Sequence, residues 1–497
     1  MAKKTINKEL TGAQDLYNFL FEACNIIRGP VSQDNFKDYI TPLLYYKRIS
    51  DVYDEETEEA LISSGGDKEY ASLPEQHRFV IPDGCHWQEV RERTENFGAA
   101  IVGAMRQIEI ANPDTLYGVL SMFSSQKWTN KAILNDSKIR DLIEHLSKRK
   151  LGNKDYPADL MGDAYEILLK KFADDSKAQA GEFYTPRSVV RLLVHILDPQ
   201  PGETVYDPAC GSGGMLIEAI RYMHDDSLCC GSIFGQEKNV VNAAIAKMNL
   251  FLHGASDFNV MQGDTLRDPK ILQGGNIAKF DCVIANPPFS LENWGATEWS
   301  SDKYKRNIYG TPSDSCGDYA WIQHMICSMV SGQGRMAVVM PQGILFRGNQ
   351  EAEIRKQLVE SDLIEAVVTL GDKLFYGTGL SPCFLIIRRM KQAHHSGRIL
   401  MIDGSKILTQ KRAQNILEEN DIDRLYSLYQ NYSDEEDYSR IVTLQEIRDK
   451  EYNLSPNRYV VYHKEEIRPY AEVLAEFKHA YEEVKRLEEE FSLLINA

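Results

Sequence analysis

The sequence predicts an α/β protein in which a doubly wound, largely parallel sheet follows a helical domain and precedes one long helix. Three patterns support this fold class. Between residues 204 and 389, short apolar runs alternate with amphipathic segments of about ten to fifteen residues, which is the pattern of βαβ units. Residues 1–150 instead carry apolar side chains at three- and four-residue spacings. The C-terminal residues carry a single apolar stripe.

The length and composition indicate an ordinary globular protein of several domains. The 497 residues suffice for about three folding units, and 43% hydrophobic with 26% charged residues excludes wholesale disorder or a fibrous repeat. We expect a cytoplasmic protein without a membrane span, because the chain lacks an apolar run of about eighteen residues and an apolar signal core near its start. The nine cysteines form no C-x-x-C pair, so neither a disulfide framework nor a metal site is expected.

The distribution of charge bears on whether the chain binds nucleic acid. The net charge of −17 is unfavourable for phosphate, but residues 418–497 alone hold 20 acidic and 10 basic residues. Residues 1–150 and 151–417 are close to neutral, with net charges of −4 and −3. DNA can therefore bind near the centre of the chain, but strong DNA binding without a partner is not expected.

Residues 1–150 are predicted to form a helical domain. Apolar and aromatic residues recur at helical spacing from Asn35 to Leu61, and a second periodic stretch runs from Trp87 to Ile110. No catalytic pattern is present in this part of the chain.

Residues 151–450 are predicted to form the catalytic domain. Strands are expected at 204–209, 232–237, 259–264, 280–287, 335–341, 363–370 and 383–389, and helices at 213–225, 239–253, 318–330 and 349–361. Ligands of such sheets bind at the carboxyl ends of the strands. The functional site is expected there because four of these strands end in polar residues, namely Asp207, Glu237, Asp264 and Asn286.

Residues 451–497 are predicted to form a tail that ends in a helix from about Glu465 to Leu494. Its apolar residues are separated by three or four positions and comprise Leu474, Phe477, Tyr481, Val484, Leu487, Phe491 and Leu494. Two interpretations remain open, since this stripe can pack on its own chain or dock on a partner.

A glycine-rich segment from Asp207 to Gly214 joins the first expected strand to a helix and reads Asp-Pro-Ala-Cys-Gly-Ser-Gly-Gly. Glycines permit close approach of the backbone to a ligand, and the start of a helix offers unpaired N–H groups. A nucleotide-like cofactor is therefore predicted at Asp207, Gly211, Ser212, Gly213 and Gly214, with a simple tight turn as the alternative. Leu216 replaces the third glycine of a dinucleotide-binding loop, which disfavours a pyrophosphate.

Two acidic residues follow the next strands. Glu237 lies 23 residues after Gly214 and is placed to accept hydrogen bonds from a ribose diol, which dinucleotides and adenosyl cofactors share. Asp264 is placed to bind an adenine amino group, with an N-cap of the next turn as an equally strong alternative. The class of cofactor stays open at this point.

The segment Asn286-Pro287-Pro288-Phe289 follows an apolar run and supplies acceptors beside an aromatic ring. The two prolines lack N–H donors, so the carbonyl oxygens and the Asn286 side chain are free to accept. Acceptors of this kind suit a planar exocyclic amine, because holding both of its hydrogens favours tetrahedral nitrogen during methyl transfer. Phe289 is expected to stack on the base. A proline-rich turn is the alternative.

A long polar loop from 290 to 317 follows this segment. It contains the aromatic and basic residues Trp294, Trp299, Lys303, Lys305 and Arg306. Long loops inside compact domains are usually functional or disordered. A mobile, DNA-contacting loop is therefore expected near the mouth of the site, with plain disorder as the alternative.

These motifs resemble those of the modification subunit of type I restriction-modification systems, a family of N6-adenine DNA methyltransferases. The resemblance rests on 207–214, 286–289 and the upstream segment Gly181-Glu-Phe-Tyr-Thr-Pro-Arg187, in the order of the gamma arrangement of these enzymes. It extends over about residues 150–460 through the segments 247–254, 263–267, 345–348, 374–379 and 452–459.

The resemblance implies a Rossmann-like catalytic domain that uses S-adenosylmethionine and methylates the N6 amine of a flipped-out adenine in duplex DNA. It implies that Ser212 to Gly214 approach the methionine part and that Glu237 binds the ribose. Asn rather than Ser before the prolines favours adenine over cytosine. The segment that lies over the cofactor is implied to comprise Glu182, Phe183, Tyr184, Thr185, Pro186 and Arg187.

The implied partners are DNA and a separate specificity subunit, because little of the chain is left to read base edges. The resemblance implies two copies of this chain per specificity subunit, and a restriction subunit as a further partner. Two other functions remain open. A protein-glutamine methyltransferase would also use Asn-Pro-Pro-aromatic, but the helical start, the 290–317 loop and the final helix disfavour it. A non-catalytic DNA-binding scaffold would be expected to have lost Asn286.

Overall fold

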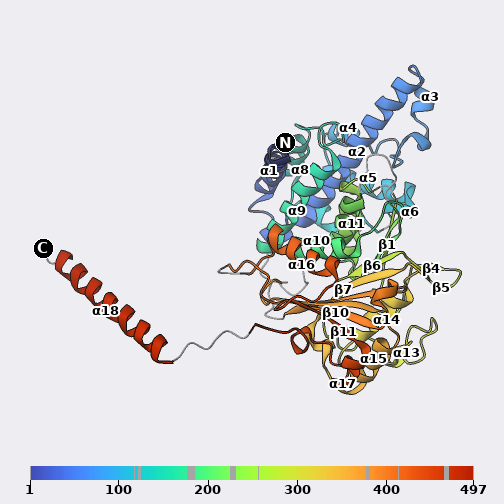
Figure 1. The fold of residues 1–497 in the computed structure, drawn as a ribbon. Coiled ribbons are helices and arrows are strands. Elements are labelled where there is room, and N and C mark those ends of the chain that lie inside the picture. The colour runs from blue at the N-terminus through green and yellow to red at the C-terminus, as the bar shows by residue number, and fades with distance from the viewer. Residues whose placement is uncertain are drawn as a thin grey trace.

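The computed structural model describes residues 2–116, 118–120, 125–175, 185–223, 231–255, 257–375, 381–411, 414–463 and 470–495. Figure 1 shows a block of helices from the N-terminal part, a large sheet covered by helices, and one helix, α18 (Tyr470–Ile495), that stands apart from both.

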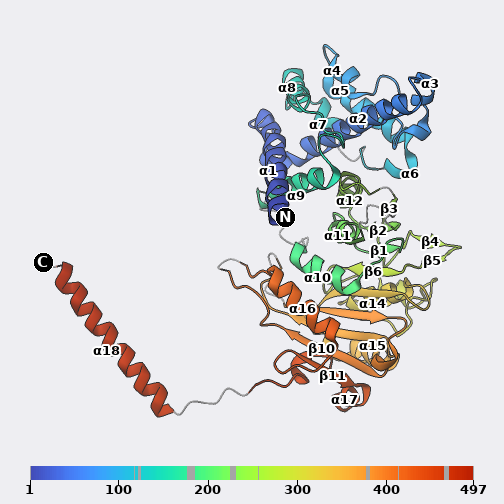
Figure 2. The ribbon, with the colours of Figure 1, turned by 45° about the horizontal axis from the view of Figure 1, so that its top comes forward.

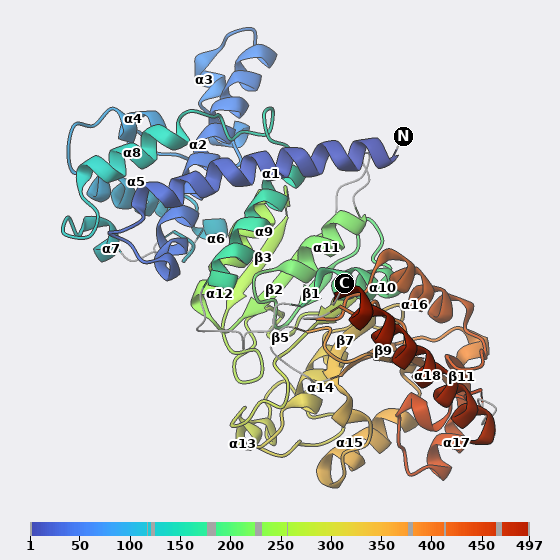
Figure 3. The same ribbon diagram turned by 90° about the vertical axis from the view of Figure 1, so that its left-hand side faces the viewer.

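The N-terminal part is helical, as predicted. Its core is formed by apolar side chains of the longer helices and extends onto α12 (Val240–Leu252) through Met248 and Phe251. The helices are α1 (Ala2–Ile27), α2 (Lys37–Ser63), α3 (Lys68–Ala71), α4 (Trp87–Arg91), α5 (Phe97–Ala111), α6 (Pro113–Leu116), α7 (Ser125–Thr129), α8 (Asp136–Leu146) and α9 (Ala158–Asp175). Figure 3 shows α9 beside α12, so the helical block rests directly on the sheet domain.

The second periodic stretch, expected from Trp87 to Ile110, is not continuous. The chain leaves helix α4 at Arg91 and starts α5 at Phe97. Asn96 lies in the left-handed region with φ of 56°, which breaks the helical path. The apolar periodicity persists across the break because both helices contribute to the same core.

The described strands form one nine-stranded sheet with the order β11-β10-β8-β9-β7-β6-β1-β2-β3. Only β9 and β11 run antiparallel to their neighbours, so the prediction of a largely parallel sheet is confirmed. The strands are β1 (Val205–Asp207), β2 (Ile233–Glu237), β3 (Phe258–Gln262), β6 (Cys282–Ala285), β7 (Arg335–Pro341), β8 (Ile364–Leu370), β9 (Pro382–Arg388), β10 (Arg398–Gly404) and β11 (Ser439–Thr443).

Helices cover both faces of the sheet, as expected for a doubly wound fold. Alternate strand residues point to opposite faces, so Val205 joins one core and Tyr206 the other. The first core contains α10 (Arg187–Leu197), α11 (Gly214–Met223), α12 (Val240–Leu252) and α16 (Glu419–Asn431). The second contains α14 (Asp318–Cys327), α15 (Asn349–Glu360) and α17 (Leu444–Asp449). Figure 2 shows α10 and α16 side by side on the first face.

The sequence prediction missed the far edge of the sheet. Strand β10 pairs with β8 in parallel, and β11 closes the edge by pairing antiparallel with β10. Only two of the five residues of β11, Ile441 and Val442, are apolar, which gives a weak sequence signal. A small hairpin of β4 (Leu272–Gln273) and β5 (Asn276–Ile277) was also missed.

The loop from 290 to 317 differs from the expected mobile, DNA-contacting loop. Trp294 and Trp299 are each only 2% exposed, and the short helix α13 (Ala296–Trp299) lies within the loop. Arg306 is buried over the Trp299 ring and donates to the carbonyl oxygens of Thr265 and Leu266. These three residues stabilise the loop from inside and cannot contact DNA, so that prediction was wrong for them. Lys303 and Lys305 are exposed.

Helix α18 (Tyr470–Ile495) stands clear of the other described elements (Figures 1 and 2). Phe477, Tyr481 and Phe491 are each more than 60% exposed. Of the two interpretations of this stripe, packing on its own chain is therefore not what the structure shows. Among the described residues, no helix is long and apolar enough to cross a membrane.

Candidate functional site

The four polar residues predicted at strand ends lie at one edge of the sheet. Strands β6, β1, β2 and β3 are consecutive neighbours, and Asp207 pairs with Gly235 of β2. Asp207 and Glu237 end their strands, and Asn286 and Asp264 follow β6 and β3 within two residues. The chain thus brings these side chains together because parallel strands end on the same side.

The glycine-rich loop between β1 and α11 has two residues in the left-handed region. Gly211 has φ of 53° and Gly213 has φ of 87°. A Cβ built on Gly213 would contact Ala246 at 3.5 Å, whereas one built on Gly211 or Gly214 would meet nothing within 4 Å. The left-handed backbone of Gly211 and Gly213 therefore shapes the turn, and the space next to Gly211 and Gly214 is open.

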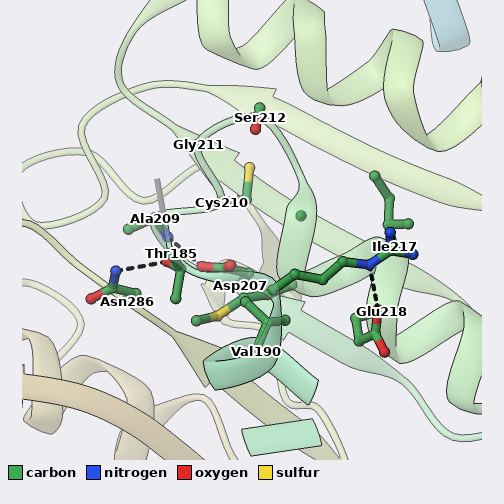
Figure 4. Close-up of a pocket in the computed structure, with 13 residues that line it drawn as sticks. Thr185, Val190, Asp207, Ala209, Cys210, Gly211, Ser212, Ile217, Glu218 and Asn286 are labelled. Carbon is green, nitrogen blue, oxygen red and sulfur yellow. Dashed lines mark hydrogen bonds and ion pairs between the residues drawn. The ribbon is translucent and has the colours of Figure 1, made fainter. Parts of the chain in front are cut away.

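A pocket lies along this loop, shown in Figure 4. Its walls come from three separate segments: residues 185–190 before and within α10, residues 207–218 from the end of β1 into α11, and Asn286 after β6. Gly213, Glu237 and Asp264 do not line it. The pocket is therefore formed by the glycine loop, the segment upstream of it and the Asn-Pro-Pro-Phe turn.

Asp207 is buried at the base of the pocket. Its carboxylate accepts a hydrogen bond from the backbone N–H of Ala209 at 2.9 Å. Burial raises the pKa of the Asp207 carboxyl to about 8, and the negative charge of Glu237 adds to the increase.

The Asp207→Asn variant is expected to have stability that depends less on pH. Because its pKa is raised, Asp207 holds a proton in the folded chain between about pH 4 and pH 8 that the unfolded chain releases. Its contribution to the free energy of unfolding is therefore full below about pH 4 and is lost as the pH rises through about 8.

Thermal unfolding between about pH 5.5 and 8.5 tests this expectation. The Tm of the parent chain should fall more steeply with pH than the Tm of Asp207→Asn, and the exposed Asp141→Asn should follow the parent. Equal slopes for the parent and Asp207→Asn would contradict it.

Glu237 joins the glycine loop to the second strand. One carboxylate oxygen accepts from the N–H of Gly211 at 3.0 Å and the other from the N–H of Asn239 at 2.7 Å. A carboxylate has further acceptor positions, so these bonds leave capacity for a ligand hydroxyl. They also fix the carboxylate beside the loop.

Asp264 has local partners. Its Oδ1 accepts weakly from the N–H of Arg267 at 3.3 Å and its Oδ2 pairs with Lys238 at 2.9 Å. This is the turn-capping geometry that the sequence left as an alternative to adenine binding.

The Asn286 side chain connects the turn after β6 to the segment before α10. Its Nδ2 donates to Thr185 Oγ1 at 2.7 Å, and its Oδ1 is buried without a hydrogen-bond partner among the residues that the structure describes. Phe289 is half-buried, with its ring centroid 6.4 Å from that of Phe375. The turn thus presents an unused acceptor beside the pocket.

A clamp that the sequence prediction missed holds the end of this turn. Ser290 has φ of 50°, and its N–H donates to the buried carboxylate of Asp318 at 2.7 Å. Arg347 donates to the other Asp318 oxygen at 2.7 Å and also contacts Cys316 and Glu351. Cys316, Asp318 and Glu351 have the spacing of a metal site, but the Arg347 guanidinium already supplies the cation among them. The only sequence signal for the clamp was the segment 345–348.

Half of the segment predicted to lie over the cofactor can be placed. Glu182, Phe183 and Tyr184 lie outside the described residues. Thr185 lines the pocket, Pro186 precedes the first turn of α10, and Arg187 begins that helix. Arg187 lies 3.4 Å from Asp163 and 3.9 Å from Glu218, which ties the segment to α9 and α11.

Comparison with known proteins identifies the family. Residues 156–467 match the family model described as N-6 DNA Methylase, and residues 16–146 match the HsdM N-terminal domain. The chain belongs to the N-6 DNA methylase family. This N-6 DNA methylase is 35% identical over 471 residues to the type I restriction enzyme MjaVII methylase subunit of Methanocaldococcus jannaschii, covering 90% of this chain and 78% of that one.

Two further proteins similar to this N-6 DNA methylase are also type I methylase subunits. The HindI methylase subunit of Haemophilus influenzae is 31% identical, covering 70% of this chain and 76% of the relative. The crystal structure of a type I restriction-modification methyltransferase subunit from Streptococcus thermophilus superposes with a TM-score of 0.77 at 26% identity, covering 91% of this chain and all of that one.

These matches confirm the predicted fold class and the resemblance to a type I modification subunit. They also confirm that this N-6 DNA methylase is a DNA methyltransferase of the adenine-specific family. The alternatives of a protein-glutamine methyltransferase and of a non-catalytic scaffold receive no support from them.

Proposed function

We propose that the chain transfers a methyl group from S-adenosylmethionine to the N6 amine of an adenine that has left the DNA duplex, within a complex that contains a specificity subunit. The observation that carries this proposal is the Oδ1 of Asn286, which is buried beside the pocket of the glycine loop and has no hydrogen-bond partner in the described part of the chain. A buried acceptor without a partner is uncommon and suits a ligand that brings its own donor.

The residues present fit S-adenosylmethionine. Gly211 and Gly214 both line the pocket, and the space that a Cβ on either would enter is open; we call this space the cradle. Buried Asp207 lies at the pocket base, and Glu237 sits beside the loop with acceptor capacity for a ribose. Thr185 and Asn286 border the same pocket, so the methyl donor and the amine acceptor can meet there.

The chain contributes positioning and electrostatic stabilisation to the reaction. The bound cofactor supplies an electrophilic methyl group. The Asn286 Oδ1 and the carbonyl oxygen of Pro287 accept the two hydrogens of the amine, which keeps its lone pair directed at that methyl and stabilises the developing positive charge. Phe289 stacks on the base, and extrusion of the base from the duplex is required for it to reach this turn.

Mapping of N6-methyladenine tests the proposed function directly. The chain is co-expressed with its specificity subunit in a host without adenine methylation, and host DNA is sequenced for modified bases. We expect N6-methyladenine at one defined site with the parent chain and none with Asn286→Ala. The absence of N6-methyladenine with the parent complex would reject the proposal.

The Gly214→Val variant is expected to lose S-adenosylmethionine binding while remaining folded. Gly214 has ordinary helical geometry and open space at its Cβ position, so valine disturbs no protein contact but occupies the cradle. Glu237→Ala should weaken the cofactor less, because a ribose contact is only part of the binding energy.

Calorimetric titration with S-adenosylmethionine measures both effects. Gly103→Val is the matched control, because Gly103 is a helical glycine in α5 with equally open space and lies in the N-terminal part. Unchanged affinity in Gly214→Val would mean that the cofactor binds elsewhere.

The proposed partners follow from α18 and from the charge of the tail. The exposed stripe of α18, with Phe477, Tyr481, Val484, Leu487 and Phe491, is a larger apolar surface than a free helix normally leaves in water. We propose that this stripe binds the specificity subunit, with two copies of the chain per complex, and that a restriction subunit joins the same assembly.

The acidic tail makes unaided DNA binding weak, and exposed Lys303 and Lys305 remain candidates for phosphate contacts.

A further inference from the structure

The two ends of the Asn286 amide have different surroundings. The amide nitrogen donates to Thr185 Oγ1 at 2.7 Å, whereas the amide oxygen is buried and has no partner among the described residues. Figure 4 shows the nitrogen turned toward Thr185 and the oxygen on the opposite side. The side chain is therefore held in one of its two possible orientations.

The orientation of this amide decides what it can do to an amine. Rotation by 180° about χ2 exchanges the acceptor oxygen and the donor NH2 in nearly the same space. With the oxygen toward the amine, Asn286 accepts an N–H bond. With the NH2 group there, an N–H of Asn286 would face an N–H of the amine, and no hydrogen bond could form between them. A hydroxyl can accept from the NH2 group and donate to the oxygen, so a bond to Thr185 fixes the place of the amide, and the amine, whose hydrogens can only be donated, selects the orientation with the oxygen toward it.

We propose that Thr185 is the positioning residue for Asn286, because its hydroxyl accepts from Nδ2 and so holds the amide where Oδ1 can accept from the adenine amine. This inference rests on the proposed function, and it gives Thr185 a role in the chemical step beside its predicted contact with the cofactor. The bond joins residues that are 101 positions apart in the chain.

Thr185 is anchored well enough for this role. Pro186 follows it with a fixed φ, and the Pro186 carbonyl accepts the N–H groups of Val189 and Val190 at 2.9 and 3.0 Å. Val189 and Leu192 of α10 are fully buried in the sheet core. The Thr185 hydroxyl is therefore presented from the start of a packed helix, and a rigid support of this kind preserves the geometry of a reacting group.

The test compares Thr185→Val, which removes the hydroxyl at constant shape, with Thr185→Ser, which keeps it. The full-length chain is assembled with its specificity subunit and mixed with duplex DNA that contains the target site and with S-adenosylmethionine carrying a tritiated methyl group. Single-turnover rates, cofactor affinity, DNA affinity and Tm are measured for each variant. Thr94→Val, at an exposed position of the N-terminal part, controls for a general effect of this replacement.

Thr185→Val is expected to slow methyl transfer by about 10- to 30-fold, the size of effect that one hydrogen bond to a reacting group produces. The slower rate should persist at saturating S-adenosylmethionine, DNA affinity and Tm should stay at parent values, and Thr185→Ser should restore most of the rate. A loss confined to the transfer step identifies an interaction made in the transition state rather than in binding.

Three results would overturn the inference. Thr185→Val could lose cofactor affinity but react at the parent rate when saturated, which would make Thr185 only a cofactor contact. Both variants could be equally slow, which would indicate shape or packing rather than the hydroxyl. Thr185→Val could react as fast as the parent. If the parent complex itself fails to methylate adenine N6, the proposed function fails instead.

Discussion

Replacing Asn286 with alanine is expected to lower the rate of methyl transfer by about 100- to 1000-fold, the usual effect of removing one preorganised polar contact to developing charge. S-adenosylmethionine affinity should stay nearly unchanged, because the amide oxygen is directed at the amine and not at the sulfonium. The structure strengthens this expectation, since the Asn286 Oδ1 is buried beside the pocket and none of the described residues bonds to it.

A methylation assay with the assembled complex, together with calorimetry of cofactor binding, measures the two effects separately. Asn276→Ala is the matched control, because Asn276 is an exposed asparagine in the β4–β5 hairpin. Retained activity in Asn286→Ala would rule out Asn286 as the residue that accepts from the amine. Loss of cofactor affinity with normal transfer at saturation would assign it to the cofactor instead.

Removing α18 is expected to abolish site-specific DNA methylation while leaving the rest of the chain folded. A chain that ends at His463 keeps the bonds of Tyr462 to Asp403 and of the His463 N–H to Asp437, which fasten the preceding segment to the sheet domain. Cofactor affinity and Tm should therefore match the full-length chain. The truncated chain should fail to form a complex with the specificity subunit, which size-exclusion chromatography measures.

Point substitutions separate the apolar stripe from the mere presence of the helix. Serine at Phe477, Tyr481 and Phe491 should reproduce the loss of the complex, because these side chains are the most exposed apolar groups of the described part of α18. Serine at the polar-face residues His479, Glu482 and Glu489 is the matched control and should leave the complex intact.

A truncated chain that unfolds would show that α18 belongs to its own core. A full-length chain that methylates one defined site without a partner would overturn the multi-subunit proposal.

The residues at the strand ends could be predicted because each depends on a short stretch of sequence. Asp207 and Glu237 close apolar runs, and Asn286 follows one directly. In a parallel sheet such ends meet at one edge whatever the detailed packing. The glycine loop was predicted for the same reason. Only the tertiary structure distinguishes Gly213, which lies against Ala246, from Gly211 and Gly214, which have open space beside them.

The function of the loop from 290 to 317 could not be predicted in this way. Trp294, Trp299 and Arg306 have the composition of a DNA-contacting loop, but a sequence does not show which side chains a distant segment covers. Burial of Arg306 depends on the carbonyl oxygens of Thr265 and Leu266, some forty residues earlier. Trp294, Trp299 and Arg306 therefore contribute to packing of the loop, whereas Lys303 and Lys305 stay exposed.

The sequence alone determined the α/β class, the strand-end residues and the amphipathic final helix, because periodicity and short motifs are local properties of the chain. The tertiary structure decided the insertion of β9 between β7 and β8, the clamp of Asp318 and Arg347 on Ser290, and the bond from Asn286 to Thr185. Each of these three features joins residues far apart in sequence, so it follows from the packing of whole elements and is not encoded in any one segment. The structure also shows that the described side chains of the α18 stripe, Phe477, Tyr481 and Phe491 among them, are exposed.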